Sequence, residues 1–166
     1  MADLRQLVTS LGHADVATYI QSGNVVFTPS GTDTSVLASE LRAAIAGRLG
    51  VDTPVVVLSR SELADVLDSN PYKDEPERRY VHMVFLPDEL DEMARSQINQ
   101  AETEIRNKGS KDELTLVGRT LYVHTPDGFG TSELATTLLA KKKSPVAAGT
   151  ARNWNTVTKL LAMCDG

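Results

Sequence analysis

The sequence predicts an α+β fold made of two partly duplicated ferredoxin-like (βαββα) units, with antiparallel hairpins and with helices packed on the sheets. The order strand, helix, hairpin, helix describes residues 80–143, whereas residues 3–49 contain only helix, hairpin and helix. The first unit therefore lacks an opening strand. We expect residues 1–70 to form the first subdomain, 71–79 a connection, and 80–166 the second subdomain with a C-terminal helix.

The first half begins with an amphipathic helix, because apolar residues recur at positions 4, 7, 8 and 11 and Gly12 follows where helices commonly end. β-Branched and aromatic residues in 16–20 and 25–28 flank a Gln-Ser-Gly-Asn turn, a pattern that predicts a hairpin. A second helical face over residues 37–49 stops at Gly50.

A short apolar run, Pro54–Leu58, predicts a buried strand. Ser59 and Glu62 then have the spacing of a capping box, which predicts a helix over residues 61–67. Charged residues and an Asn-Pro-Tyr sequence interrupt the pattern over 71–79, so we expect an exposed connection there.

The second half repeats the alternation of strands and helices. It predicts a strand over 80–86, a helix from 90 to 105, a hairpin over 114–125, a helix over 131–142 and a last helix over 156–163. A first sheet that lacks one strand leaves an unpaired edge, through which we expect two copies of the chain to form a homodimer.

Composition narrows the class of protein. The 166 residues are 41% hydrophobic and 23% charged, as in globular domains, and the formal net charge of −5 disfavours nonspecific nucleic-acid binding. Aromatic residues make up only 5%, which weighs against stacking of RNA bases on a sheet. The longest apolar runs fall far short of the roughly 20 residues that span a bilayer. We expect a cytoplasmic protein that does not bind membranes.

Groups that carry chemistry are sparse. The single cysteine, Cys164, excludes an intramolecular disulfide. The three histidines, His13, His82 and His124, have no partner at metal-ligand or catalytic-triad spacing, so we assign them structural roles. The sequence indicates no catalytic residue, metal ligand or cofactor.

A glycine-containing loop before the helix predicted over 131–142 is a candidate anion-binding loop, because backbone N–H groups at a helix start favour phosphate or carboxylate. Its candidate residues are Gly128, Gly130, Thr131 and Ser132. The interpretation that we favour is that the glycines make the turn and Thr131 caps the helix. Lys141–Lys143, at the other end of this helix, are explained by solvation and by the helix dipole.

The most informative cluster stands before the last helix and holds an arginine, two amides and the only tryptophan. Its residues are Arg152, Asn153, Trp154, Asn155 and Thr156. In one interpretation the tryptophan fills a seam between subdomains, the arginine and Asn153 satisfy buried carbonyls, and Asn155 or Thr156 caps the helix. In the other interpretation the cluster forms a polar ligand pocket.

Two long motifs, Thr18–Phe27 and Thr150–Leu160, resemble the bacterial family DUF1697, a domain of unknown function. The resemblance implies an α+β fold with a duplicated ferredoxin-like character and no assigned activity. It also implies an opening strand and a glycine-containing loop ahead of Met1. Where the family pattern tends to have serine, lysine and leucine, this chain has Ser132-Glu133-Leu134, so the anion contact of that lysine is not carried over.

Two functions from different classes follow. The leading hypothesis is a non-enzymatic binding or interaction module, since no nucleophile and base or pair of carboxylates can be assembled from the sequence. The rival hypothesis is a protein that binds, or acts on, a phosphorylated small molecule or nucleotide through Arg152, Asn155 and the loop 128–132.

Overall fold

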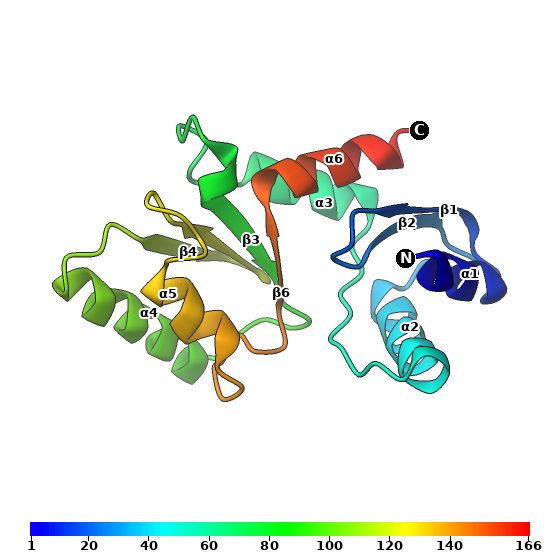
Figure 1. Cartoon of the computed structure of the whole chain (residues 1–166), viewed down its shortest axis with the longest axis horizontal. Coiled ribbons are helices and arrows are strands. Elements are labelled where there is room, and N and C mark those ends of the chain that lie inside the picture. The colour runs from blue at the N-terminus through cyan, green and yellow to red at the C-terminus, as the bar shows by residue number, and fades with distance from the viewer. The chain divides into compact units, whose positions relative to one another are not determined.

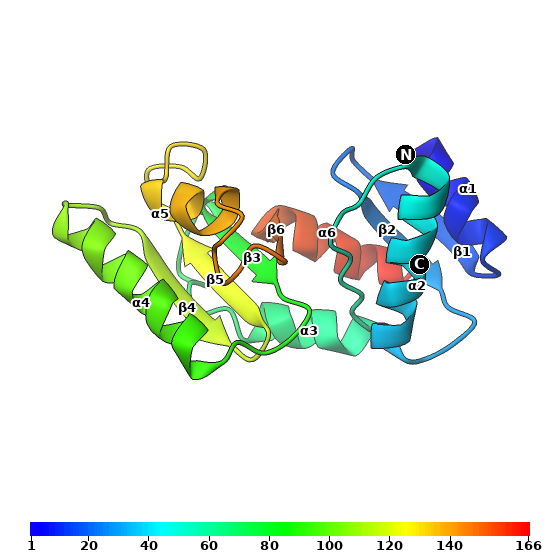
Figure 2. The same ribbon diagram turned by 90° about the horizontal axis from the view of Figure 1, so that it is seen from below.

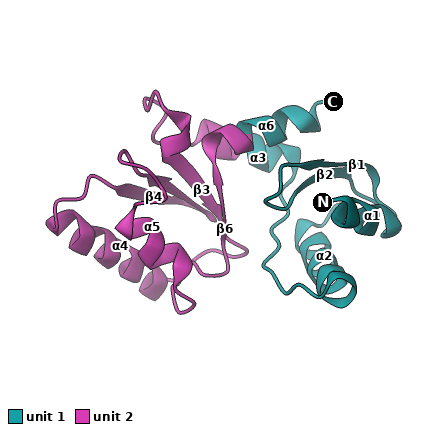
Figure 3. Cartoon of the chain, viewed as in Figure 1, with its two compact units in different colours: residues 1–64, 158–166 teal, residues 65–157 magenta.

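The computed structural model describes all 166 residues and confirms an α+β fold with two antiparallel sheets (Figure 1). The chain divides into two compact units, unit 1 of residues 1–64 and 158–166 and unit 2 of residues 65–157 (Figure 3). Two helices, α3 (Arg60–Asp68) and α6 (Trp154–Cys164), have residues in both units. None of the helices has the length and apolar character needed to cross a membrane.

Unit 1 contains the first predicted helix, hairpin and second helix. These are α1 (Ala2–Ser10), the antiparallel strands β1 (Ala14–Tyr19) and β2 (Asn24–Thr28), and α2 (Thr34–Leu49). Helix α2 ends at Gly50, which adopts φ 70° in the left-handed region that glycine tolerates best. The sequence pattern for these four elements is confirmed.

The core of unit 1 is thin. Helices α1 and α2 lie on one side of the hairpin (Figure 1), and Leu7, Val8 and Leu41 are the buried residues of the core cluster between them. The other contributors are half-buried: Leu4, Leu11, Val16, Val25, Phe27, Ala44, Ile45, Val55 and Val57. A two-stranded sheet covers too little area to bury these side chains completely.

The predicted strand over residues 54–58 is wrong. The segment after α2 forms no ladder, and β2 pairs with β1 alone. Val55 and Val57 do pack on the core of unit 1, so the apolar run reports burial correctly. A strand also needs a neighbouring strand for its backbone, and this segment pairs with none.

The capping box that opens α3 is confirmed. The backbone N–H of Ser59 donates to Glu62 Oε2 at 2.7 Å, and the N–H of Glu62 donates to Ser59 Oγ at 3.2 Å. These reciprocal bonds satisfy two amides that a helix start leaves without partners, so the helix begins where the sequence indicates.

Unit 2 holds a four-stranded antiparallel sheet in the order β4-β5-β3-β6. Its strands are β3 (Val81–Phe85), β4 (Glu113–Val117), β5 (Thr120–His124) and β6 (Thr150–Asn153), and α4 (Glu92–Asn107) connects β3 to β4. The first three strands and α4 were predicted. The polar strand β6, Thr-Ala-Arg-Asn, was missed because it shows no alternation of apolar residues.

The helix predicted over 131–142 is shorter. It begins as α5 (Glu133–Ala135) and continues as a π-helical turn, Thr136–Ala140. Ser132, not Thr131, caps it: Ser132 Oγ accepts the N–H of Ala135 at 2.9 Å. The three lysines after Ala140 are exposed, as their position at the helix end predicted.

Both faces of the second sheet are covered. Helices α4 and α5 lie on one face (Figures 1 and 2), where Val84 and Leu121 join Ile98 and Leu134 in the main core. On the other face the fully buried Tyr122 donates its hydroxyl to the backbone carbonyl of Val66 in α3, at 2.6 Å. Unit 2 therefore has a thicker core than unit 1.

Gly149 lies just before β6 where a side chain does not fit. A Cβ atom there would stand 2.7 Å from Val84 Cγ1 and 3.0 Å from Leu86 Cδ2, both in the core. We predict that Gly149→Ala lowers the free energy of unfolding by about 1–3 kcal/mol, because an overfilled core must shift. Urea denaturation measures this loss. The control Gly31→Ala, with nothing within 4 Å, should change stability little, and equal effects would contradict the packing.

Candidate functional site

The junction of β6 and α6 shows what Asn153 does. Its Oδ1 accepts the backbone N–H of Thr156 at 2.9 Å, so Asn153 caps α6, which begins at Trp154 rather than at residue 156. The sequence interpretation named Asn155 or Thr156 as the cap and was wrong, because the strand before the helix was not recognised. Asn155 is exposed and Thr156 is buried.

Arg152 is turned toward its own strand. Its Nη1 donates to the carbonyl oxygen of Ala151 at 2.7 Å and to Thr150 Oγ1 at 2.9 Å. Burial lowers the pKa of this guanidinium. A charged group that satisfies nearby backbone oxygens while partly removed from water supports the scaffold interpretation of the cluster.

Trp154 receives a cation on its ring. The guanidinium carbon of Arg78, in a short 3₁₀ turn before β3, lies 4.8 Å from the ring centroid. This cation–π contact joins residue 78 to the start of α6 within unit 2. Arg78 is exposed, so the contact is of the surface kind, worth roughly 0.5–1 kcal/mol.

The candidate anion-binding loop borders a hollow of about 270 Å³ near the end of α4. Lys108, Asp112, Asp127 and Glu133 are the charged residues of its lining. Asp112 is buried and accepts a hydrogen bond from Ser132 Oγ at 2.7 Å, while Lys108 Nζ pairs with Glu133 Oε1 at 2.8 Å. Three carboxylates against one lysine give the hollow a negative balance, which disfavours a phosphate.

The two candidate clusters do not meet in one pocket. In the β3–β6 ladder Arg152 stands opposite Met83, and Met83 stands opposite Tyr122, whose hydroxyl reaches α3. The loop 128–132 leads into α5, on the face where Val84 packs. Since neighbouring residues of a strand point to opposite faces, Arg152 and the loop lie on opposite sides of the sheet.

A third polar cluster, in segment 71–79 and the strands below it, was not found from the sequence. Glu75 Oε2 lies 2.6 Å from His124 Nε2, Tyr72 stacks on His124, and the Tyr72 hydroxyl bonds Thr115 Oγ1 at 2.8 Å. The N–H of Glu77, and after it His124, lower the pKa of the Glu75 carboxyl. The partners are more than 40 residues apart, so no local spacing could reveal them.

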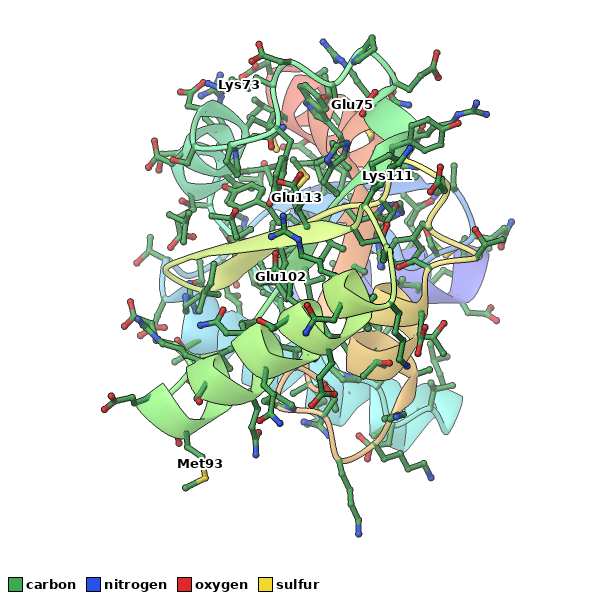
Figure 4. All side chains as sticks on the ribbon, turned by 90° about the vertical axis from the view of Figure 1, so that its left-hand side faces the viewer. Lys73, Glu75, Met93, Glu102, Lys111 and Glu113 are labelled. Carbon is green, nitrogen blue, oxygen red and sulfur yellow. The ribbon has the colours of Figure 1, made fainter.

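This third cluster anchors the loop rather than forming an open site. The side chains of His124 and Glu75 are only 16% and 14% exposed. Figure 4 shows Glu75, Glu113 and Glu102 following one another from the loop through β4 to α4, with Lys73 and Lys111 nearby. Glu102 in turn pairs with Arg106 at 3.5 Å, so Glu75 and Glu102 at this end of unit 2 serve local ion pairs.

The stacked pair of His82 and Phe129 fixes the loop 128–132 to the sheet. The ring centroids are 3.7 Å apart with planes at 17°. Burial lowers the pKa of His82 to about 4, and its Nδ1 is buried without a hydrogen-bond partner. A neutral imidazole under an aromatic ring therefore serves packing in this structure.

Comparison with known proteins places the chain in a family. Residues 1–122 match the family described as protein of unknown function (DUF1697), and the chain belongs to that family. The resemblance stated from the two motifs is thereby confirmed. No match to a curated protein was found for the chain.

A solved structure shares the fold. The chain is similar to the conserved bacterial protein SP0830 from Streptococcus pneumoniae, with 22% sequence identity and a TM-score of 0.72. The alignment covers 100% of this chain and 89% of that protein. At this level of identity the likeness speaks for the fold alone.

The cap of α6 gives a direct test of the junction. We predict that Asn153→Ala lowers the free energy of unfolding by about 0.5–2 kcal/mol, because the N–H of Thr156 loses its acceptor. The matched control Asn155→Ala, at an exposed position two residues on, should cost less than about 0.5 kcal/mol. Chemical denaturation of both variants decides between Asn153 and Asn155 as the cap, and a larger loss for Asn155→Ala would refute the assignment.

His82 gives the fold a pH dependence. Its pKa in the folded chain, about 4, lies below the ordinary value of 6.5, so the unfolded chain binds the proton more readily between these values. Stability is therefore complete above pH 6.5 and falls as the pH drops toward 4.

We predict that the wild type loses about 1–2 kcal/mol more between pH 7 and pH 5 than His82→Phe does, since phenylalanine keeps the stack without a titrating group. Denaturation curves at both pH values measure the difference. Equal losses in the two proteins would show that His82 is not held neutral.

Proposed function

We propose that this chain is a cytoplasmic, non-enzymatic binding or interaction module. The observation that carries the proposal is the open edge of the β1–β2 sheet in unit 1, where apolar side chains are half-buried. An exposed strand edge is a template for pairing with another polypeptide. In unit 2, by contrast, Asn153 and Ser132 cap helices, and His124 is paired with a carboxylate.

The proposal includes an architecture. We infer that both units follow the ferredoxin-like plan, the second with its opening strand β3 and the first without one. The order β4-β5-β3-β6, with helices after the first and third strands of unit 2, supports this interpretation of unit 2. We also propose that the chain has two subdomains, residues 1–70 and 80–166, and that residues 71–79 connect them.

The features of segment 71–79 are those of an exposed connection that a few side chains hold against the sheet. Most of its residues are exposed, while Tyr72 and Glu75 are half-buried against β4 and β5. A connection of this kind keeps polar backbone at the surface and uses few side chains to set its path.

A homodimer is one way to use the open edge. Two copies of β2 related by a twofold axis can pair antiparallel and satisfy the backbone of both edges. Sedimentation at increasing concentration tests this arrangement, and a strict monomer at high concentration contradicts it.

The rival proposal is a site for a phosphorylated small molecule or nucleotide at the hollow beside loop 128–132. The hollow and the backbone N–H groups at the start of α5 favour it. Its carboxylates weigh against it, as does the position of Arg152 on the other face of the sheet. Because the observations against a phosphate site outweigh those that favour it, we prefer the interaction module as the proposed function.

Thermal melting with small ligands separates the two functions. A molecule that binds the folded chain raises the melting temperature with the ratio of its free concentration to its dissociation constant. The interaction module predicts that inorganic phosphate, nucleotides and sugar phosphates leave the melting temperature unchanged. A saturable rise that Ser132→Ala or Arg152→Ala abolishes would overturn the proposal in favour of the rival.

A further inference from the structure

The outer edge of β4, in unit 2, is open. β4 stands first in the order β4-β5-β3-β6, so it pairs with β5 and has no strand on its other side. No turn or loop backbone bonds to residues 113–117 either. The ladder to β5 is regular, and the strand Glu-Leu-Thr-Leu-Val contains neither proline nor lysine. Bulges, prolines and lysines are the features that commonly keep edge strands apart, so this edge is ready to pair.

Helix α4 borders the open edge. Figure 4 looks onto it and shows β4 and α4 next to each other. A hollow of about 260 Å³ lies between them, lined by Arg95, Ile98 and Asn99 from α4 and by Leu114, Thr115 and Leu116 from β4. Ile98 and Leu114 are buried, and Leu116 is half-buried against the same core. The hollow therefore has an apolar floor and a polar helical rim.

Polar residues form one stripe on α4 next to its buried face. This α4 stripe consists of Glu92, Arg95, Asn99, Glu102 and Arg106, whose spacings of three and four place them on one side of the helix. Burial raises the pKa of the Tyr72 hydroxyl, on which the charges of Glu102 and Arg106 also act. That hydroxyl bonds Thr115 in β4. Since Arg95 and Asn99 line the hollow, the stripe follows the edge of β4.

The charges of the α4 stripe are complementary to themselves. Their order along the chain is acid, base, amide, acid, base, and the reversed order has the opposite charge at each place. Two antiparallel stripes would therefore set Glu92 against Arg106 of a second copy and Arg95 against its Glu102, with Asn99 at the centre. The stripe carries no net charge, whereas the chain carries −5, so two copies meet little repulsion on this face.

The sheet leads to the same twofold arrangement. β3 and β4 both run antiparallel to β5, so the helix that connects them returns against the direction of β4. A twofold axis at Thr115 pairs β4 antiparallel with its copy and sets Leu114 opposite Leu116. Asn99 lines the hollow together with Thr115, so this axis also passes near the centre of the α4 stripe. One symmetry operation thus satisfies the strand edge and the helix charges together.

We propose that unit 2 binds a second copy of the chain along the outer edge of β4, with the two α4 stripes facing each other. This surface goes beyond the proposed function, whose open edge belongs to the β1–β2 sheet. An unrelated polypeptide can pair with the backbone of β4, but only a second copy supplies the order of charges that matches the stripe. The two half-buried Leu116 side chains become covered in this dimer.

Charge reversal tests the contact between Arg95 and Glu102. Arg95→Glu sets carboxylate against carboxylate at both symmetric contacts, and Glu102→Arg sets guanidinium against guanidinium. We expect each variant to raise the dimer dissociation constant at least about tenfold in sedimentation equilibrium. The double variant restores opposite charges and should return the constant to within about threefold of the wild-type value. Residues 95 and 102 are two helical turns apart, so this rescue reports contact between copies.

Two further sets of variants control the test. Glu104→Arg changes the net charge as Glu102→Arg does, but Glu104 is exposed outside the stripe, so the dissociation constant should stay unchanged. Glu92 and Arg106, both exposed, form the outer contact. Glu92→Arg and Arg106→Glu should each weaken the dimer, and their combination should restore it. This second swap decides the matter if Glu102→Arg disturbs the fold.

Three results would overturn the proposal. The first is a wild-type chain that remains monomeric at high concentration. The second is a dimer that the stripe variants leave unchanged, which would assign dimerisation to another surface and leave the proposed function untouched. The third is a dimer that Glu104→Arg weakens as much as Glu102→Arg does, because net charge rather than the stripe would then control association.

Discussion

The backbone of a buried strand must find hydrogen-bond partners on both of its edges, and the structure of each unit follows from how far this requirement is met. In unit 2 the central strand β3 has a partner on each side, and the sheet is wide enough to carry a core on both faces. In unit 1 the hairpin stands alone, and apolar residues that surround it stay half-buried. The narrow two-stranded sheet thus accounts for a core with few buried residues and for an extended segment without a ladder.

Much of the fold follows from local patterns in the sequence. Three local signals predicted α1, α2, α4 and both hairpins: amphipathic spacing, glycine at helix ends and the turn residues of the hairpins. These signals can be recognised in the sequence because each acts within a few residues. The capping box of Ser59 and Glu62 was equally local. The prediction of a strand over residues 54–58 failed because an apolar run indicates burial but does not indicate whether a partner strand exists.

The polar clusters were harder to predict for the same physical reason. Strand β6 is recognised only through its ladder to β3, and without it Asn153 cannot be identified as the cap of α6. Glu75 and His124 are in contact although they lie 49 positions apart in the sequence. Arg152 and the loop 128–132 looked like parts of one site because both are polar, whereas the register of the sheet puts them on opposite faces. Long-range pairing decides each of these points.

Amide hydrogen exchange of the wild-type chain, measured residue by residue by nuclear magnetic resonance, tests the open edge of β2 most directly. We predict slow exchange throughout β5, which is paired on both sides. In β2 we predict slow exchange only for amides that face β1, and fast exchange for the remaining amides of residues 25–28 and for those of residues 55–58. Slow exchange of all these amides in the isolated monomer would show that the edge is covered, and would contradict the account.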